Sequence, residues 1–277
     1  MSIPNLDIRP IAGALGAEIH GVNLAKDLDD DMFAAIHQTM LDHCVIMFRD
    51  QDISPQAQID FAKRWGKLHK HPFMPGLKGH PELLEIVKKE DDVHTLGGDW
   101  HTDQMFTAVP ALATMLYAKE TPPAGGDTLF SNMYMAYDAL SDAMKAMLAD
   151  ARTVNIYTKN KGRAAAMKND YSDGEPEEYV HPLFRTHPET GRKTLYLSYK
   201  GVTRRIAGLS DEESGPILDF LMKHATRPEF TCRFAWEPGS LGIWDNRSVM
   251  HLAVNDYHGF RRVMHRLTIE GQPIKAA

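Results

Sequence analysis

Three residues of the sequence have the types and spacing of a metal site. His101 and Asp103 lie two positions apart in the run Trp-His-Thr-Asp, and His251 lies far downstream. Alternate residues of an extended strand point to the same face, so the pair could bind one ion from one side. Two imidazoles and one carboxylate suit ferrous iron, because three further positions stay open for substrate and oxygen. A His-x-Asp pair also occurs by chance, so taken alone it favours a solvated aspartate.

Two arginines near the end of the chain, Arg262 and Arg266, form a second group of interest. They lie four positions apart on a strand expected over residues 261–269, so both side chains face the same side. A buried arginine is costly unless it meets an anion, and its planar fork suits a carboxylate or a sulfonate. A single arginine is more often found at the surface. Arg266 could also pair with a structural carboxylate, such as Asp245 or Glu270.

The segments that must position these residues are mostly short strands. Alternating or continuous apolar runs bounded by glycine and proline predict them. They are expected near residues 6–24 (as a hairpin), 44–49, 83–87, 111–119, 181–185, 194–197, 230–236, 241–245 and 261–269. In this interpretation the His-x-Asp pair is carried by a strand, and His251 comes just after one.

Three helices are expected near residues 29–43, 54–64 and 210–224. The first begins with three aspartates, which favour a helix N-terminus. The second begins with Ser-Pro, a capping residue followed by the preferred first helical residue. The third begins with the Ser-x-x-Glu pattern of a capping box.

Many short strands with a few helical insertions favour a mainly β fold, a double-stranded β-helix (jelly-roll, cupin-like) barrel, over alternating βαβ units. We interpret residues 1–277 as one dioxygenase-sized domain, because β barrels often reach this length. Helical or lid insertions are expected at about residues 88–98 and 133–178. Residues 88–98 and 159–178 contain many polar or charged residues, and we expect these two segments to be the least ordered and to border the substrate entrance.

Composition excludes several classes of protein. The 277 residues are 43% hydrophobic, and 31 basic against 37 acidic residues give a net charge of -6, so no nucleic-acid partner is expected. No apolar run approaches the length of a membrane span, and no signal peptide is expected at the start. Cys44 and Cys232 lie in apolar surroundings, as buried thiols of a reducing compartment do. We therefore expect a cytoplasmic protein without membrane contact.

Seven longer stretches carry a resemblance to a known family. They are residues 16–22, 48–51, 66–72, 100–103, 125–128, 244–247 and 261–266. In this order they resemble the iron(II)- and 2-oxoglutarate-dependent dioxygenases of the taurine dioxygenase and 2,4-dichlorophenoxyacetate dioxygenase group, from about residue 8 to residue 270. Several long motifs in the order of the family are far more specific than one His-x-Asp pair.

The resemblance implies the cofactors and their ligands. His101, Asp103 and His251 match the iron(II) ligands of the family. Arg262 matches the arginine that holds the distal carboxylate of 2-oxoglutarate, and Thr128 matches its hydroxyl partner. The implied reaction uses O2 to hydroxylate an unactivated C–H bond, with succinate and CO2 as co-products. The protein would supply position, a dry cavity and clamps for anions.

The resemblance also implies substrate residues. Arg266 and His71 match residues that hold the sulfonate in taurine-specific members, and Trp100 and Trp244 match aromatic residues that line the iron site. The implied substrate is therefore a small organic anion: a sulfonate, a sulfate ester or a carboxylate.

Two positions depart from the taurine-specific pattern. Met74 stands where a tyrosine contacts the sulfonate, and Gly97 stands where an asparagine contacts the substrate. Both changes remove hydrogen-bonding groups, so we expect a larger or less polar substrate than taurine. An aryloxy-carboxylate or an amino-acid-type compound is an alternative substrate for the same fold and cofactors.

Two other classes of protein could use the same ligands. A zinc hydrolase would need a base near the metal-bound water, and the sequence has no His-Glu-x-x-His or similar element. A non-catalytic cupin-like metal-binding protein would have no use for the keto-acid clamp of Arg262 and Thr128. Family members are often dimers or tetramers, so we expect a homo-oligomer.

Overall fold

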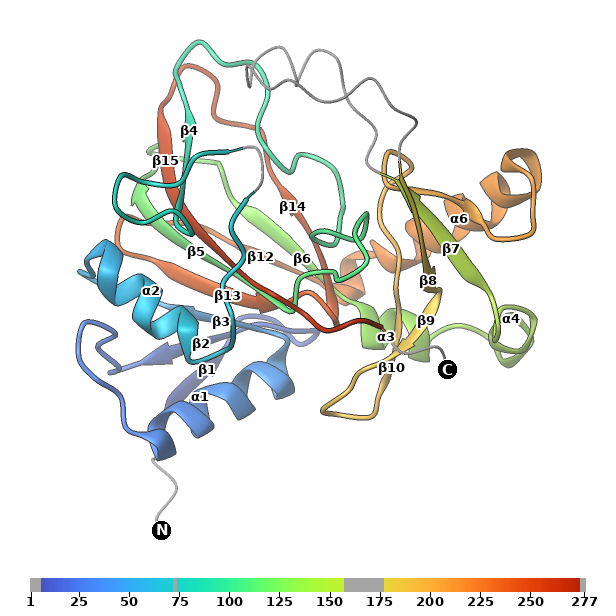
Figure 1. Cartoon of the computed structure of the whole chain (residues 1–277), viewed down its shortest axis with the longest axis horizontal. Coiled ribbons are helices and arrows are strands. Elements are labelled where there is room, and N and C mark those ends of the chain that lie inside the picture. Colours follow the sequence, from blue (N-terminus) through green and yellow to red (C-terminus); the bar gives the residue numbers. More distant parts are fainter. Residues whose placement is uncertain (1–5, 72–73, 157–176, 275–277) are drawn as a thin grey trace.

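A seven-stranded sheet crosses the molecule and carries its longest strands (Figure 1). The structure is a computed structural model that describes residues 6–71, 74–156 and 177–274. Neighbouring strands of this sheet are antiparallel, except that β2 and β3 are parallel. In spatial order they are β1 (Asp7–Pro10), β2 (Ala17–His20), β3 (Val45–Phe48), β13 (Leu241–Asp245), β5 (Ala113–Glu120), β15 (Arg262–Ile269) and β4 (Leu84–Lys88).

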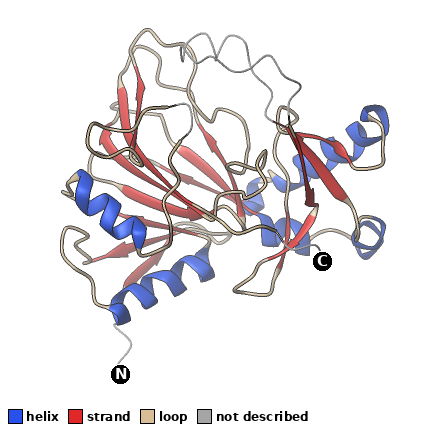
Figure 2. Cartoon of the chain, viewed as in Figure 1, coloured by secondary structure: helices blue, strands red, loops and turns tan. Residues whose placement is uncertain are grey.

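Three smaller sheets complete the β structure of the described residues. One has β6 (Thr128–Asn132) between β12 (Thr231–Phe234) and β14 (Val249–Ala253). The other two comprise β11 (Thr203–Ile206), β7 (Arg152–Ile156) and β8 (Glu178–Pro182), and then β10 (Lys193–Leu195) and β9 (Phe184–Thr186). Strands occupy the centre of the molecule and helices its edges (Figure 2), so the fold is mainly β, as the sequence predicts.

Two helices, α1 (Asp30–His43) and α2 (Pro55–Lys63), lie beside the large sheet (Figure 2). Their first turns are capped as the sequence predicts. Asp29 accepts a hydrogen bond from the backbone N–H of Met32 at 2.7 Å, and Ser54 accepts one from that of Ala57 at 3.2 Å. Such caps satisfy N–H groups that the first turn of a helix leaves without partners.

The remaining helices lie away from α1 and α2. They are α3 (Met133–Asp138), α4 (Asp142–Met147), α6 (Asp211–Ala225) and the 3-10 helix η1 (Pro228–Phe230). The capping box predicted for α6 is complete, with Ser210 and Glu213 bonding to each other's backbone N–H. No helix within the described ranges is both long enough and apolar enough to cross a membrane.

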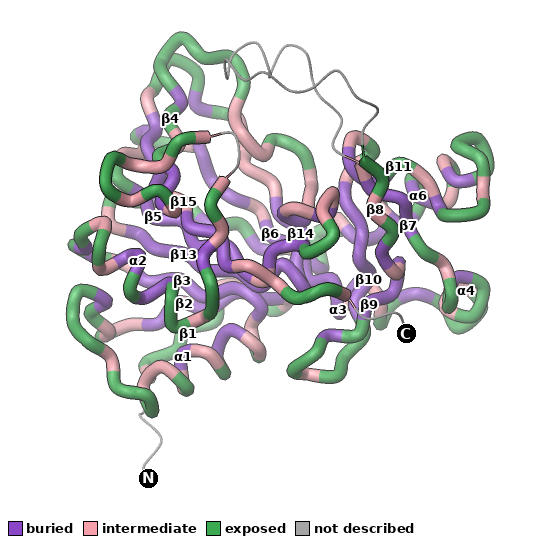
Figure 3. The backbone as a smooth tube through the Cα atoms, viewed as in Figure 1, coloured by how far each residue is buried: buried purple, intermediate pink, exposed green. Residues whose placement is uncertain are grey.

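The core has two layers because both faces of the large sheet are covered (Figure 3). On β3, Ile46 and Phe48 pack with α1 and α2, whereas Val45 and Met47 belong to a second cluster. That second cluster also contains Phe130 of β6 and residues of β12 and β14. The β12-β6-β14 sheet therefore packs face to face with the large sheet, and alternation along each strand divides its side chains between the layers.

The structure corrects two expectations about the ligand segments. His251 lies within β14 rather than after a strand. The His101–Asp103 stretch is not a strand but part of the connection between β4 and β5, and it touches β14 through a single β-bridge. Apolar patterning does not reveal this, because the bridge is made by backbone atoms of residues far apart in the sequence.

The expected insertions also differ in detail. Lys88 is the last residue of β4 and is buried, so the polar segment begins after it. The segment from residue 133 contains α3 and α4 as expected, but then β7, a central strand of a small sheet. Residues 157–176 of that insertion lie outside the described residues.

Candidate metal centre

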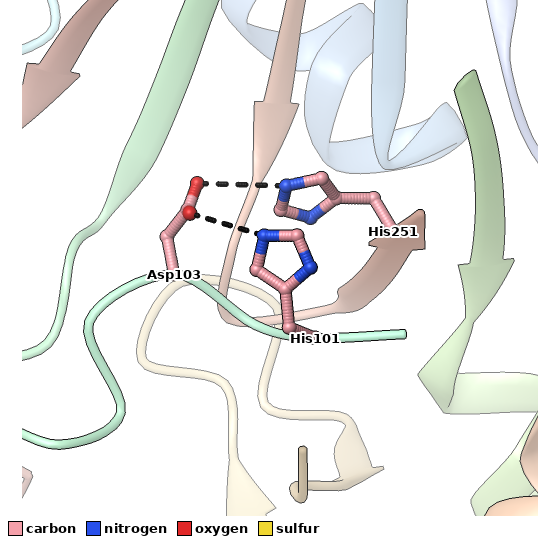
Figure 4. A group of neighbouring side chains, drawn as sticks. All are labelled: His101, Asp103 and His251. Carbon is pink, nitrogen blue, oxygen red and sulfur yellow. Dashed lines mark ion pairs between the residues drawn. The ribbon is translucent and has the colours of Figure 1, made fainter. Parts of the chain in front are cut away.

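Backbone pairing brings the two histidines of the expected triad together. The N–H of His101 donates to the carbonyl of His251 at 2.9 Å, and the N–H of His251 donates back at 2.8 Å. Both side chains leave this bridge on one side, where their rings lie with centroids 4.1 Å apart (Figure 4). Asp103 reaches the same place from the turn two residues after His101. The bridge fixes the two imidazoles without help from any ion.

The ligand atoms of the three side chains lie close together. Nε2 of His101 lies 3.6 Å from Oδ1 of Asp103, and Nε2 of His251 lies 3.7 Å from its Oδ2 (Figure 4). One ligand atom of each residue lies within 4.8 Å of the others, and no second group of this kind is found among the described residues. Ligands at about 2.1 Å from a first-row metal ion lie roughly 3 Å apart when they occupy one octahedral face. Small side-chain movements would therefore suffice to bind an ion.

Asp103 is held in the charged form that a metal needs. Its side chain is 5% exposed. Oδ2 accepts a hydrogen bond from the Thr114 hydroxyl at 2.6 Å, and Oδ1 lies 2.7 Å from Nη2 of Arg266. Burial alone would raise the pKa of the carboxyl, but the charge of the Arg266 guanidinium above all holds it well below its usual range.

The histidines are set up as neutral ligands. Nδ1 of His101 donates to the carbonyl of Asp99 at 2.7 Å, which leaves the Nε2 lone pair directed toward Asp103. Burial, and then the neighbouring His101, lower the pKa of His251 well below its ordinary value. Neutral imidazole is the form that coordinates metals, and a hydrogen bond on the second nitrogen fixes its tautomer. A buried donor set of two nitrogens and one carboxylate therefore fits a divalent first-row metal.

Aromatic residues surround His251 more closely than His101. The ring of Trp244 lies 4.7 Å from that of His251, and its indole N–H donates to Asn246 at 3.1 Å. Phe130 stacks on His251 at 6.1 Å. Trp100 packs instead against a separate cluster that includes Met250. Of the two predicted aromatic residues, Trp244 is thus the one found in contact with a triad ring.

A second group of polar side chains lies around Arg262. The guanidinium is 7% exposed, and its Nε and Nη2 have no hydrogen-bond partner among the described residues. Burial lowers the pKa of Arg262, with partial opposition from Tyr257 and Asp127. Gly126, at φ +72°, allows the side chains of Arg262 and Tyr257 to lie close to the backbone. A Cβ at this position would lie 3.3 Å from Cδ of Arg262 and 3.2 Å from the Tyr257 ring.

Thr128 stands two residues after Gly126 and retains a hydroxyl hydrogen to donate. Its Oγ1 accepts a hydrogen bond from the indole N–H of Trp236 at 2.9 Å. Sequence reasoning gave Trp236 no role beyond the strand expected over residues 230–236. The available signal was that a buried indole N–H usually requires an acceptor nearby.

Arg266 lies between the metal centre and His71, since it contacts Asp103 and its charge acts on the His71 ring. Arg266 contacts Asp103 rather than the structural partners considered for it, because Asp245 pairs with Arg247 and Glu270 pairs with a lysine. Its Nε is buried without a partner among the described residues. Burial, reinforced by Arg266, lowers the pKa of His71 to about 4, so the ring is neutral at pH 7.

The two positions that depart from the taurine pattern both touch this region. The backbone N–H of Met74 donates to Nδ1 of His71 at 3.0 Å, which leaves the ring hydrogen on Nε2. Gly97 has φ +82°, and a Cβ there would lie 3.1 Å from Cε1 of His101. Any side chain at Gly97 would be strained and would press on His101, so bare backbone lies beside the His101 ring at this position.

Thr114 and Asp99 are site residues that sequence reasoning missed. Thr114 is the second residue of β5, and Asp99 acts through its backbone carbonyl. Nothing in the local sequence marks either one, because each is recruited by the three-dimensional position of a triad member.

Comparison with known proteins finds relatives along the whole chain. The family described as "Taurine catabolism dioxygenase TauD, TfdA family" matches residues 7–268. The alpha-ketoglutarate-dependent sulfate ester dioxygenase of Pseudomonas putida is 34% identical over 96% of this chain and 90% of its own length. An (S)-phenoxypropionate/alpha-ketoglutarate-dioxygenase of Sphingobium herbicidovorans is 31% identical, over 98% of this chain and 96% of that protein. The crystal structure of a taurine dioxygenase from Burkholderia xenovorans matches with a TM-score of 0.85 and 34% identity, over 97% of this chain and 90% of that one.

Proposed function

Because the chain belongs to the TauD, TfdA family and is an Fe(II)- and 2-oxoglutarate-dependent dioxygenase, we propose that it hydroxylates an unactivated C–H bond of a small organic anion. Succinate and CO2 are the co-products. The observation that carries this function is the His101, Asp103 and His251 cluster, together with the buried Arg262, whose Nε and Nη2 have no partner among the described residues. A zinc hydrolase or a passive metal-binding protein has no need of such an arginine.

The metal would be held by Nε2 of His101, Nε2 of His251 and the carboxylate of Asp103. Bound iron, keto acid and O2 together supply the oxidising chemistry. The contribution of the chain is to keep these ligands in position: Thr114 and Arg266 hold the carboxylate, and the Asp99 carbonyl fixes the tautomer of His101. Such supporting contacts orient ligands and tune their basicity.

The keto acid would be oriented by Arg262 and Thr128. Arg262 offers two nitrogens without partners, and Thr128 has a hydroxyl hydrogen to donate because its oxygen already accepts from Trp236. A carboxylate between them would receive charge-assisted hydrogen bonds in a dry pocket, where such bonds are strong.

The organic substrate would meet Arg266 and His71 through its anionic group. Arg266 uses one terminal nitrogen on Asp103, and its Nε is available. The bare backbone at Gly97 and the thioether of Met74 leave few polar groups for the rest of the substrate, which favours an alkyl sulfate or a longer sulfonate over taurine. The relative that acts on sulfate esters supports this class. The phenoxypropionate dioxygenase keeps an aryloxy-carboxylate as the second candidate, and an amino-acid-type compound is the third.

We also propose that the two facing sheets form a jelly roll, the double-stranded β-helix expected from the sequence, within one domain. In support, the chain passes repeatedly between them: from β5 to β6, from β12 to β13, and from β14 to β15. Cys44 and Cys232 are both free and buried, which supports the proposed cytoplasmic location. Assembly as a dimer or tetramer stays a prediction.

The test is oxygen uptake by iron-loaded protein with 2-oxoglutarate and a panel of anions. The panel should contain taurine, longer alkyl sulfonates, alkyl sulfates and aryloxy-carboxylates, with succinate measured in each case. We expect an alkyl sulfate or longer sulfonate to stimulate uptake most and succinate to match it. Sulfate release without 2-oxoglutarate or O2 would indicate a hydrolase instead, and a neutral compound as the best substrate would contradict the anion site.

A further inference from the structure

Lys88 is a buried lysine without an acidic partner. Its side chain lies at the end of β4 and is 5% exposed, and its ammonium has no hydrogen-bond partner among the described residues. Its one described interaction is with the face of the Tyr257 ring, whose centroid lies 4.6 Å from Nζ. Lysine is almost never fully buried unless it is paired, and one cation–π contact replaces little of the lost hydration.

The neighbour of Lys88 across the sheet is Arg262. The strands β4 and β15 lie side by side (Figure 1). Lys88 and Arg262 are paired in their register, so their side chains lie on the same side of the sheet. Tyr257 links them further, because its ring underlies Nζ of Lys88 and its hydroxyl interacts with the Arg262 guanidinium. Two buried cations thus lie side by side.

Among the described residues, no carboxylate forms an ion pair with Lys88 or Arg262. The closest acidic residue along this edge, Asp127, contacts Nε of Arg233 at 2.5 Å, and Asp256 contacts the same arginine at 3.1 Å. Asp256 also accepts the backbone N–H of Gly126 at 2.8 Å. Both carboxylates therefore pair with Arg233, and Asp256 also holds the turn at Gly126. Lys88 and Arg262 meanwhile repel each other in a region of low dielectric.

We propose that Lys88 is a further binding residue for 2-oxoglutarate, and that its ammonium and the Arg262 guanidinium together enclose the distal carboxylate of the keto acid. This inference rests on the proposed function. One carboxylate has two oxygens and about four acceptor positions, so it can serve a forked guanidinium and an ammonium at once.

The position of Lys88 assigns it to the keto acid rather than to the organic substrate. Arg266, the proposed partner of the substrate anion, faces Leu84 at the other end of the same strand pair. Four residues of strand separate the two levels by about 13 Å. Lys88 therefore lies at the level of Arg262, the proposed partner of the keto acid, and not at the level of Arg266, the proposed partner of the substrate anion.

The experiment measures binding of keto acids to Mn(II)-loaded protein by calorimetry, so that no turnover is needed. Lys88→Met removes the charge and keeps the apolar stem over Tyr257, and Lys88→Arg keeps a cation. Lys89→Met is the matched control, since Lys89 is exposed beside it. The ligands are 2-oxoglutarate and 2-oxopentanoate, which has the same chain length but lacks the distal carboxylate.

We expect Lys88→Met to bind 2-oxoglutarate about 10- to 100-fold more weakly, as for loss of one hydrogen bond to a charged group. Its affinity for 2-oxopentanoate should stay unchanged, its melting temperature without ligand should not fall, and Lys88→Arg should retain most of the binding. Unchanged 2-oxoglutarate affinity in Lys88→Met would overturn the inference, as would equal losses for both keto acids with a lower melting temperature. Wild-type protein that binds no 2-oxoglutarate would instead overturn the proposed function itself.

Discussion

Two buried groups of charged residues in this protein differ in one respect, which is how completely they are hydrogen-bonded. Asp245 accepts three hydrogen bonds from Arg247 at 2.6–2.8 Å and one from His187 at 2.9 Å, and Arg247 also contacts Glu189. We call these four residues the Asp245 network. In the pocket of Arg262 and Lys88, three side-chain nitrogens have no partner among the described residues.

This difference indicates that the Asp245 network stabilises the fold, whereas Arg262 and Lys88 are kept to bind a ligand. A buried polar group without a partner costs free energy, so native proteins have few of them, and each one calls for an explanation. The Asp245 network supplies hydrogen-bond partners for its own charged groups and needs no ligand. The pocket of Arg262 and Lys88 has an excess of positive charge that only an added anion can balance. Mutations should therefore destabilise the fold in the first region and weaken ligand binding in the second.

The largest effect is expected at the triad. His101→Ala and His251→Ala should each abolish iron-dependent oxygen uptake, because two ligands cannot hold the metal in the required geometry. The iron content of purified protein and the oxygen uptake measure this. The exposed His94 offers a control, and His94→Ala should behave as wild type. Either triad variant with normal iron content and uptake would show that the ligands are wrongly assigned.

Breaking the Asp245 network should have the largest effect on stability. Asp245→Asn leaves the Arg247 charge without its main partner, which typically costs about 3–5 kcal/mol of unfolding free energy. Asp138→Asn, at an exposed ion pair with Arg192, should cost about 0–1 kcal/mol. Denaturant unfolding compares the two variants, and equal losses would remove the distinction between the regions.

The same variant should alter the pH dependence of stability. Burial alone would raise the pKa of Asp245, but Arg247 and His187 hold it well below its ordinary value. A carboxyl with a lowered folded-state pKa stabilises above its unfolded pKa of about 3.9 and loses this contribution as the pH falls. Wild type should therefore lose stability more steeply than Asp245→Asn below about pH 4. Parallel curves would contradict the ionised network.

Arg262→Met should weaken use of 2-oxoglutarate without destabilising the protein. Truncating one member of a desolvated, charge-assisted pair costs about 2–5 kcal/mol of binding free energy, and the folded protein loses no internal partner of Nε or Nη2. Steady-state kinetics should show a raised KM for 2-oxoglutarate and a nearly unchanged KM for the organic substrate. An unaltered KM for the keto acid would refute the assignment.

Arg266→Ala should have the smallest effect on the free energy of ligand binding. The substrate anion should lose about 1.5–3 kcal/mol of binding free energy, and the preference for anionic over neutral compounds should narrow. Because Arg266 also contacts Asp103, iron affinity should fall as well. A loss of iron affinity with unaltered substrate specificity would make Arg266 a support for Asp103 and nothing more.

Sequence reasoning succeeded where the cause of a structure is local. Helix starts at Asp29, Ser54 and Ser210 follow from short-range hydrogen bonds that neighbouring residues can make. The strand predicted over residues 261–269 is present as β15 and carries both Arg262 and Arg266.

Sequence reasoning failed where a distant part of the chain decides. Lys88 lies in a charged stretch that resembles a loop, and only its pairing with Arg262, far along the chain, buries it. The contact between Asp103 and Arg266 and the position of His251 inside β14 likewise depend on how strands are matched across the molecule. Such pairings cannot be predicted from any short segment of the sequence.

The β-bridge between His101 and His251 also constrains when the metal centre can come into being. The two residues are 150 positions apart, and their backbone bonds require β14 to be in place. Contacts of such long sequence separation form late, because closing the loop costs entropy before any contact compensates it. A growing chain on the ribosome has most of its strands, and His101 with Asp103, long before His251 emerges. The complete set of three ligands is therefore available to iron only after β14 has been synthesised and paired with the segment of His101.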